Sequence, residues 1–114
     1  MPQYVLLIYP PVEPAPADDP GMQISRWIEY GQSLHDAGVH VADKRLDRPE
    51  VSTTVRVRDG ETLITDGPFA ETNEYLAGYY VIDTPDLDTA LAHAARVPNV
   101  HYASIEVRPV LSAP

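Results

Sequence analysis

The clustering and alternation of apolar residues predict the main strands of a sheet. Residues 4–9 form a continuous apolar run that is too short for a helix and is typical of a central strand buried on both faces. Residues 75–83 are also apolar on both faces and predict a second central strand. Residues 103–110 alternate and predict a closing strand, with Ile105 and Val107 inward and Ser104, Glu106 and Arg108 on the opposite face.

Residues 53–65 carry the pattern of a β-hairpin. Strict alternation places Thr53, Val55 and Val57 on one face and Thr54, Arg56 and Arg58 on the other. Asp59-Gly60 then favours a type I′ turn into a strand over residues 61–65. With this hairpin, the pattern predicts one sheet of about five strands.

Two segments have helical spacing. Asp19 is expected to cap the first helix, with Pro20 in its first turn and Gly38 at its end. Its apolar positions are Ile24, Trp27, Ile28, Gly31, Leu34 and His35. The second helix is expected to start at residues 84–86 and to end at Pro98, with a buried stripe of Leu87, Ala90, Leu91 and Ala94.

The two remaining long segments are expected to be loops. Residues 10–20 contain five prolines and three acids, which predicts a surface loop without helical structure. Residues 39–50 are mixed and charged, and we interpret them as a connecting loop with a short strand near residues 39–41.

Counting faces predicts a homodimer. Two helices can cover only one face of the sheet, yet strands 4–9 and 75–83 are apolar on both sides. The second face would leave an apolar patch that soluble monomers rarely expose, so we expect two subunits to pack open face to open face around a two-fold axis. On this argument Ile82 lies on the open face, where an aspartate would separate the subunits.

Composition narrows the function classes. The 114 residues predict a single domain over residues 1–114, and the net charge of −9, without a Lys/Arg cluster, argues against nucleic acid as a partner. No apolar run is long enough to span a membrane, and the start at residues 1–4 lacks the basic region of a signal peptide, so a cytoplasmic location is expected. The absence of cysteine excludes disulfides and thiolate chemistry.

The most distinctive segment is residues 66–74, Asp-Gly-Pro-Phe-Ala-Glu-Thr-Asn-Glu. Gly67 can adopt a positive φ and Pro68 fixes its own φ, which predicts a rigid turn that Phe69 is expected to anchor to the body. Asp66, Glu71 and Glu74 flank this corner. The segment has two interpretations, a tight turn with solvated acids or the rim of a pocket.

Residues 66–74 resemble the signature of the DGPF branch of the YCII-related proteins. The resemblance continues through residues 4–9, 54–60, 78–82 and 104–110, in the order that the family has them. It implies a bacterial α+β protein with a ferredoxin-like sandwich, a mainly antiparallel sheet with two helices on one face, of the dimeric α+β barrel type. The family's biochemical role is largely unassigned, and relatives are fused to sigma factors.

Alternation also suggests a binding site on the open face. Arg56 and Arg58 share that face with Glu106 and Arg108, and Tyr80 is expected to join them beside Gly78. Two arginines and a tyrosine could bind a small anion through guanidinium hydrogen bonds, so we assign Arg56, Arg108, Tyr80 and Glu71 as candidate ligand-binding residues. The alternative is structural, with Arg56–Glu106 or Arg108–Asp66 ion pairs at the sheet edges or at the dimer interface.

The candidate catalytic group is Asp66, as a general acid or base oriented by an arginine. The broader family is suspected of enzymatic activity that depends on a His and an Asp. His35, His40, His93 and His101 do not stand in a recognised catalytic or metal-ligand spacing, so none is assigned that role. Glu71 and Glu74 alone make a weak metal site, and no phosphate-binding glycine loop is present, so neither a metal nor a cofactor is expected.

Two function hypotheses follow. The first is a dimer that binds or transforms a small polar or anionic metabolite in a cleft at the open sheet face. The second is a non-catalytic interaction module linked to sigma-factor-dependent transcription, for which the acidic surface fits a protein partner better than DNA.

Overall fold

The computed structural model describes residues 2–112, which form six strands and two α-helices. The first half of the chain contains β1 (Gln3–Tyr9), the 3-10 helix η1 (Pro20–Met22), α1 (Ile24–Asp36), β2 (His40–Arg45) and the 3-10 helix η2 (Pro49–Val51). The second half contains β3 (Thr53–Arg58), β4 (Glu61–Asp66), β5 (Gly78–Asp83), α2 (Leu87–Ala94) and β6 (Ser104–Pro109).

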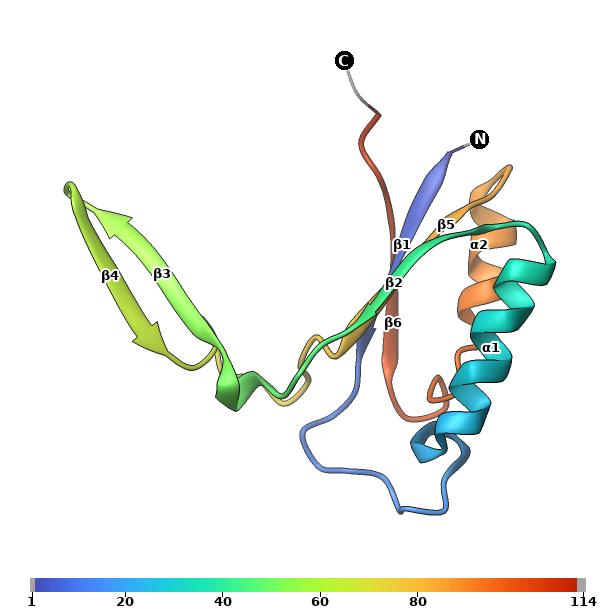
Figure 1. Ribbon diagram of the computed structural model, residues 1–114, viewed down its shortest axis with the longest axis horizontal. Coiled ribbons are helices and arrows are strands. Elements are labelled where there is room, and N and C mark those ends of the chain that lie inside the picture. Colours follow the sequence, from blue (N-terminus) through green and yellow to red (C-terminus); the bar gives the residue numbers. More distant parts are fainter. Residues whose placement is uncertain (1, 113–114) are drawn as a thin grey trace.

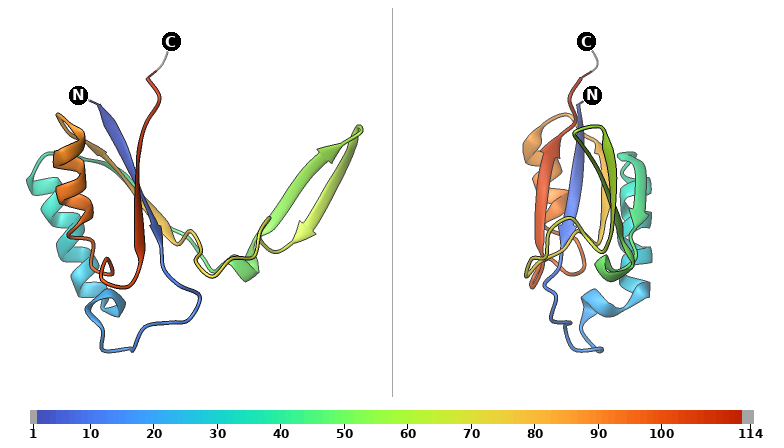
Figure 2. Two further views of the ribbon diagram at one scale, coloured as in Figure 1. Left: turned by 180° about the vertical axis from the view of Figure 1, so that it is seen from behind. Right: turned by 90° about the vertical axis from the view of Figure 1, so that its left-hand side faces the viewer.

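The main sheet has four antiparallel strands in the order β2-β5-β1-β6. Both helices pack on one face of this sheet, and the opposite face carries no helix (Figures 1 and 2). The two βαβ units β1-α1-β2 and β5-α2-β6, in this strand order, make a ferredoxin-like α+β sandwich. The predicted ferredoxin-like α+β fold is therefore confirmed, and its dimeric form stays a prediction.

The hydrophobic core lies between the sheet and the helices. Every second residue of β1 is buried, beginning with Tyr4, and the same alternation in β5 buries Gly78, Tyr80 and Ile82. The register joins Tyr4 to Ile82 and Leu6 to Tyr80, so these side chains share the helix-covered face. The buried hydrophobic residues are Tyr4, Leu6, Ile8, Tyr30, Leu34, Val39, Tyr80, Ile82, Ala90, Ala94 and Val97.

This register corrects two placements made from the sequence. Tyr80 and Ile82 lie on the helix-covered face, where Ile82 is 0% exposed, and not on the open face. Strand 75–83 starts only at Gly78, and because it is apolar on both sides, its pattern alone could not tell the two faces apart. The open face instead carries half-buried apolar residues in its two central strands, namely Val5, Leu7, Tyr79 and Val81.

The hairpin is a second sheet of its own and not part of the main sheet, so the prediction of a single five-stranded sheet was wrong. β3 and β4 pair only with each other and form an arm that projects from the body (Figure 1). The turn has the predicted conformation, because Asp59 and Gly60 have φ values of 52° and 79°. We call residues 53–66 the arm.

The edge position expected for the hairpin is taken by β2. Five of its six residues pair with β5, with a register shift at Val41, where the sequence suggested a loop with a short strand at residues 39–41. Four of the six residues are polar or charged, which hides the strand pattern, but an edge strand can carry charged side chains while its backbone makes the sheet hydrogen bonds. The close approach is visible at Gly78, where a Cβ atom would lie 2.7 Å from the carbonyl oxygen of Lys44.

The helices bury narrower faces than predicted. Asp19 does cap a helix, but it is η1, where Asp19 Oδ1 accepts a hydrogen bond from Gly21 N at 2.8 Å. The buried residues of α1 are Tyr30 and Leu34, while Ile24 and Ile28 remain 66% exposed. In α2 the buried residues are Ala90 and Ala94, and the two leucines of the expected stripe are largely exposed. Within residues 2–112, neither helix has the length and apolar character required to cross a bilayer.

Candidate functional site

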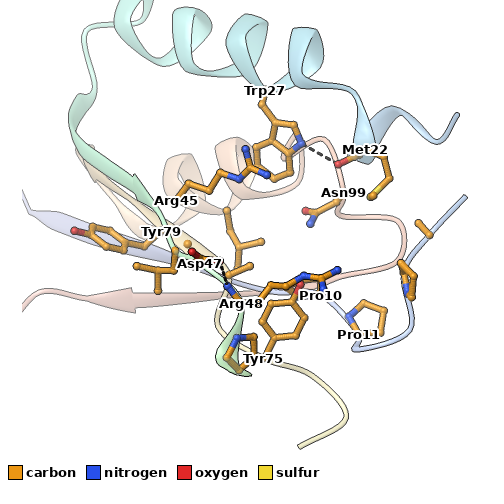
Figure 3. Close-up of a pocket in the computed structure, with 18 of the residues that line it drawn as sticks. Pro10, Pro11, Met22, Trp27, Arg45, Asp47, Arg48, Tyr75, Tyr79 and Asn99 are labelled. Carbon is orange, nitrogen blue, oxygen red and sulfur yellow. Dashed lines mark hydrogen bonds between the residues drawn. The ribbon is translucent and has the colours of Figure 1, made fainter. Parts of the chain in front are cut away.

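A cavity of about 920 Å³ lies on the helix-covered side of the sheet, where β1 and β2 end and β5 begins. Its walls come from the proline-rich loop at Pro10 and Pro11, the start of α1 at Trp27, and the turns at Tyr75 and Asn99 (Figure 3). This volume lies within the range of small-molecule sites in proteins. It is therefore the candidate functional site.

Aromatic side chains form much of the cavity wall. The indole of Trp27 is held by a hydrogen bond from its Nε1 to the carbonyl oxygen of Gly21 at 2.9 Å. Gly21 is packed so tightly that a Cβ atom would lie 2.6 Å from the hydroxyl of Tyr102 and 2.7 Å from Cβ of Asn99. Burial raises the pKa of Tyr102, so its hydroxyl stays protonated near neutral pH. This part of the wall is thus aromatic and closely packed.

The loop that closes the cavity is tied to the body by polar contacts. Val12 N donates to the carbonyl oxygen of Asn73 at 2.8 Å. At the other end of this loop, His101 Nε2 lies 2.9 Å from both carboxylate oxygens of Asp19. The bond to His101, together with the Gly21 N–H, lowers the pKa of Asp19. These contacts hold residues 10–19 at the cavity although this segment has no helix and only a single isolated bridge, between Pro11 and Glu74.

Two arginines line the cavity without forming an ion pair. No side-chain hydrogen bond or salt bridge joins Arg45 or Arg48 to another residue of the described chain, residues 2–112. The nearby acids have other contacts, because Asp43 Oδ2 lies 2.6 Å from His40 Nε2 and Asp47 Oδ1 accepts from Arg48 N at 2.7 Å. Both guanidinium groups remain available to an anion (Figure 3).

One buried polar atom in the cavity wall has no partner. Asn99 is 5% exposed, and its Oδ1 makes no hydrogen bond within residues 2–112. Buried side-chain oxygens are nearly always paired in folded proteins, so this atom marks a position where a donor is missing.

The structure does not bring the site residues predicted from the sequence together within one chain. Arg56 belongs to the arm, where its Nη2 lies 3.4 Å from the carbonyl oxygen of Phe69. Arg108 lies on the open face of β6 and donates through Nε to Glu106 Oε2 at 2.7 Å, so the Arg108–Asp66 pair does not form. Tyr80 lies on the other face and packs edge-on against Tyr30, and burial raises its pKa to about 12.

The Asp66 corner is exposed. Gly67 has the expected positive φ of 104°, and its N–H donates to the carbonyl oxygen of Ser52. Phe69 is 78% exposed, so the prediction that it anchors the turn to the body was wrong. Asp66 ends β4, and Glu71 lies in the exposed segment that follows. No arginine of the described residues orients Asp66.

Sequence reasoning missed the histidine–carboxylate pairs and the cavity arginines. His40 pairs with Asp43 and stacks on His35 with ring centroids 3.9 Å apart, while His101 reaches Asp19 across 82 residues of sequence. The three-residue spacing of His40 and Asp43 can be read from the sequence. It does not predict a contact between them unless residues 40–45 are known to form a strand. Arg45 and Arg48 were passed over because their segment was interpreted as a loop. Among residues 2–112, no group of three or more His, Asp or Glu side chains is arranged to hold a metal.

Comparison with known proteins assigns the chain to a family. The family model of the YCII-related domain matches residues 3–113. This protein belongs to the YCII-related family. A relative within the curated proteins, an uncharacterized protein of Rhizobium meliloti (strain 1021), is 46% identical over 68 residues. The aligned region is 58% of this chain and 55% of that protein, so the chain spans about half the length of this curated relative.

Proposed function

We propose that this YCII-related protein binds a small organic anion in the cavity, with Arg45 and Arg48 as the anion-binding residues. The observation that carries the proposal is the pair of arginines without ion-pair partners at one cavity, in a chain where 17 acids outnumber 8 bases. Unpaired guanidinium groups amid an excess of carboxylates favour a site that is reserved for an external anion.

The lining limits the kind of anion. Most of the wall is apolar or aromatic, with Met22 beside Trp27 and Pro10 and Pro11 across the cavity (Figure 3). An inorganic ion would leave these surfaces wet, whereas an organic carboxylate can cover them. The ligand of this proposal therefore has an apolar body and one anionic end.

Cinnamate tests this proposal, with neutral cinnamamide as the matched uncharged probe. Isothermal titration should give tighter binding of cinnamate, and Arg45→Gln and Arg48→Gln should each weaken it by about tenfold. This is the lower end of the range for a charged hydrogen bond, chosen because both arginines are exposed. Arg58→Gln in the arm, whose Nη1 donates to the carbonyl oxygen of Val57, is the control and should change nothing. Equal affinity of the two probes, or unchanged affinity in both cavity variants, would contradict the proposal.

In this proposal the protein is a homodimer, and the second copy of the chain covers the apolar surfaces that one chain leaves exposed. The open face presents Leu7 and Val81 without a covering helix, and the arm exposes Val55 and Ile64 by 64% and 70%. A two-stranded ribbon with no packing partner is marginally stable at best, so both surfaces favour a homodimer in which each arm lies against the other subunit. The candidate roles of Arg56, Asp66, Glu71 and Arg108 stay predictions for that assembly.

The arm also favours a second candidate function, an interaction module that contacts a protein of the transcription machinery. Exposed apolar residues on a projecting ribbon suit a protein partner, and the acidic chain disfavours nucleic acid. Deletion of residues 53–66 distinguishes the two functions. If the arm only serves the homodimer, the deletion variant keeps cinnamate binding in the cavity and loses dimerisation alone. Loss of a sigma-factor contact with an intact dimer would favour the interaction module.

A further inference from the structure

The unpartnered oxygen of Asn99 specifies the ligand more closely. We infer that the bound molecule is an aromatic carboxylate that carries a hydroxyl or amino donor, which it gives to Asn99 Oδ1 while Arg45 and Arg48 hold its carboxylate. This inference rests on the proposed anion site and extends it from a charge preference to a chemical class.

The first step is the position of the amide. Asn99 precedes β6 in a tight turn, where its backbone carbonyl accepts hydrogen bonds from Tyr102 N at 3.1 Å and Ala103 N at 2.8 Å. These bonds fix the backbone, and the side chain is directed into the space between Trp27 and Pro10 (Figure 3). The fold therefore fixes the backbone of Asn99 and buries its side chain in the cavity wall.

The second step is the lack of an internal donor. The indole N–H of Trp27 lies in the same wall, but it is already bound to the Gly21 carbonyl. The Asn99 side chain also contacts the Tyr102 hydroxyl, and this contact acts to lower the pKa of that phenol against the larger effect of burial. Asn99 Oδ1 itself has no hydrogen-bond partner within residues 2–112, so it is left for an external donor.

The third step is the shape and charge of the remaining wall. Trp27, Tyr75 and Tyr102 supply flat apolar surfaces, which favour an aromatic ring over a flexible aliphatic chain. The cationic groups that lack partners, Arg45 and Arg48, stand on the β2 side of the cavity, and Asn99 stands on the β6 side. A ligand that reaches both must carry an anion for Arg45 and Arg48 and a separate donor for Asn99.

Paired probes test the inference. 4-Hydroxycinnamate and cinnamate differ only in the donor, as do 4-hydroxybenzoate and benzoate, which vary the distance between the two ends. In at least one pair the hydroxylated acid should bind at least about tenfold tighter, because without it the buried Asn99 oxygen stays unpaired. The Asn99 side-chain amide signals in a nitrogen-15 NMR spectrum should shift with the hydroxylated acid and not with its partner.

Variants separate this inference from the proposed function. Asn99→Leu should bring the two acids of the pair to equal affinity, while the exposed Asn73→Leu should leave the difference intact. If both acids bind equally to the natural protein and Arg48→Gln still weakens them, the anion site stands and the role of Asn99 is overturned, with its oxygen bound to water only. If no probe binds, the proposed function fails and this inference fails with it. The NMR and affinity comparison on the natural protein decides the matter even if Asn99→Leu does not fold.

Discussion

The body and the arm of this protein use the same strand alternation with opposite results. In β1 and β5 every second side chain is buried under the helices, and Leu6 and Ile82 are 0% exposed. In the arm, Val55 and Ile64 face each other in register but remain 64% and 70% exposed. Alternation therefore specifies a strand and its two faces, while the elements packed against a face decide whether that face contributes to stability.

The largest contrast is expected in the unfolding free energy. Leu34→Ala should lower it by about 2–5 kcal/mol, because the side chain is fully buried in the body. Ile64→Ala, at an exposed position of the arm, should change it by about 0.5 kcal/mol or less at protein concentrations where the chain is monomeric. Urea titrations at two protein concentrations check both values. Equal effects of the two variants would show that the arm packs within its own chain.

The next contrast is expected in the oligomeric state, between the centre and the margin of the open face. Leu7→Asp places an unpaired charge on the open face, so light scattering should fall from about twice the 12.6 kDa chain mass to a single chain. Ser104→Asp, on the same face but at its exposed margin, is the control and should leave the dimer intact. A natural protein that is monomeric at micromolar concentration would contradict the role of the open face.

Substitutions at two glycines compare the effect of side-chain crowding in the body with that of backbone strain in the arm. Gly21→Ala should cost about 1–3 kcal/mol and weaken probe binding, because its Cβ would press on Tyr102 and Asn99 in the cavity wall. Gly60→Ala should cost about 1–2 kcal/mol through its φ of +79°, and it should leave probe binding unchanged since nothing lies near its Cβ. Melting curves and titrations separate the two outcomes. Equal loss of binding in both variants would contradict the separation of arm and cavity.

The smallest expected effect is on the pH dependence of the melting temperature, through Asp19 in the body. The pKa of Asp19 is lowered in the folded chain, mainly by the His101 hydrogen bond, so its contribution to stability is full above the ordinary carboxyl pKa and is lost as the pH falls through the lowered value. Asp19→Asn should therefore melt at a lower temperature than the natural protein near neutral pH, and this difference should shrink below about pH 4. Asp59→Asn, in the turn of the arm, is the control. A difference that is constant down to about pH 2 would exclude the carboxylate as its source.

The sequence predicted the fold class because the central strands and the two helices have strong apolar patterns. It failed at β2 and at the arm for a common reason. The edge of the main sheet is decided by backbone pairing between segments 40–45 and 78–82, which charged side chains neither favour nor reveal. Once β2 was mistaken for a loop, the hairpin was left as the remaining candidate for the sheet edge.

The candidate site was less predictable than the fold. Its parts come from the proline-rich loop, the start of α1, the end of β2 and the turn at Asn99, which no local pattern connects. Alternation predicted that Arg56 and Arg108 share one face of a single sheet. This prediction was wrong because Arg56 lies in the arm, which is a separate sheet. The missing partner of Asn99 is a property of packing and has no trace in the sequence.

The two sheets can form at different stages of protein synthesis. The arm pairs Thr53 with Asp66, so its ladder can close as soon as this short segment has left the ribosome. The body pairs Tyr4 with Pro109, and its central strand must wait for nearly the whole chain before β6 can join it. Until then β1 presents one unpaired apolar edge to the solvent, and the nascent chain is most prone to aggregate at this strand rather than at the arm that looks more exposed in the finished molecule.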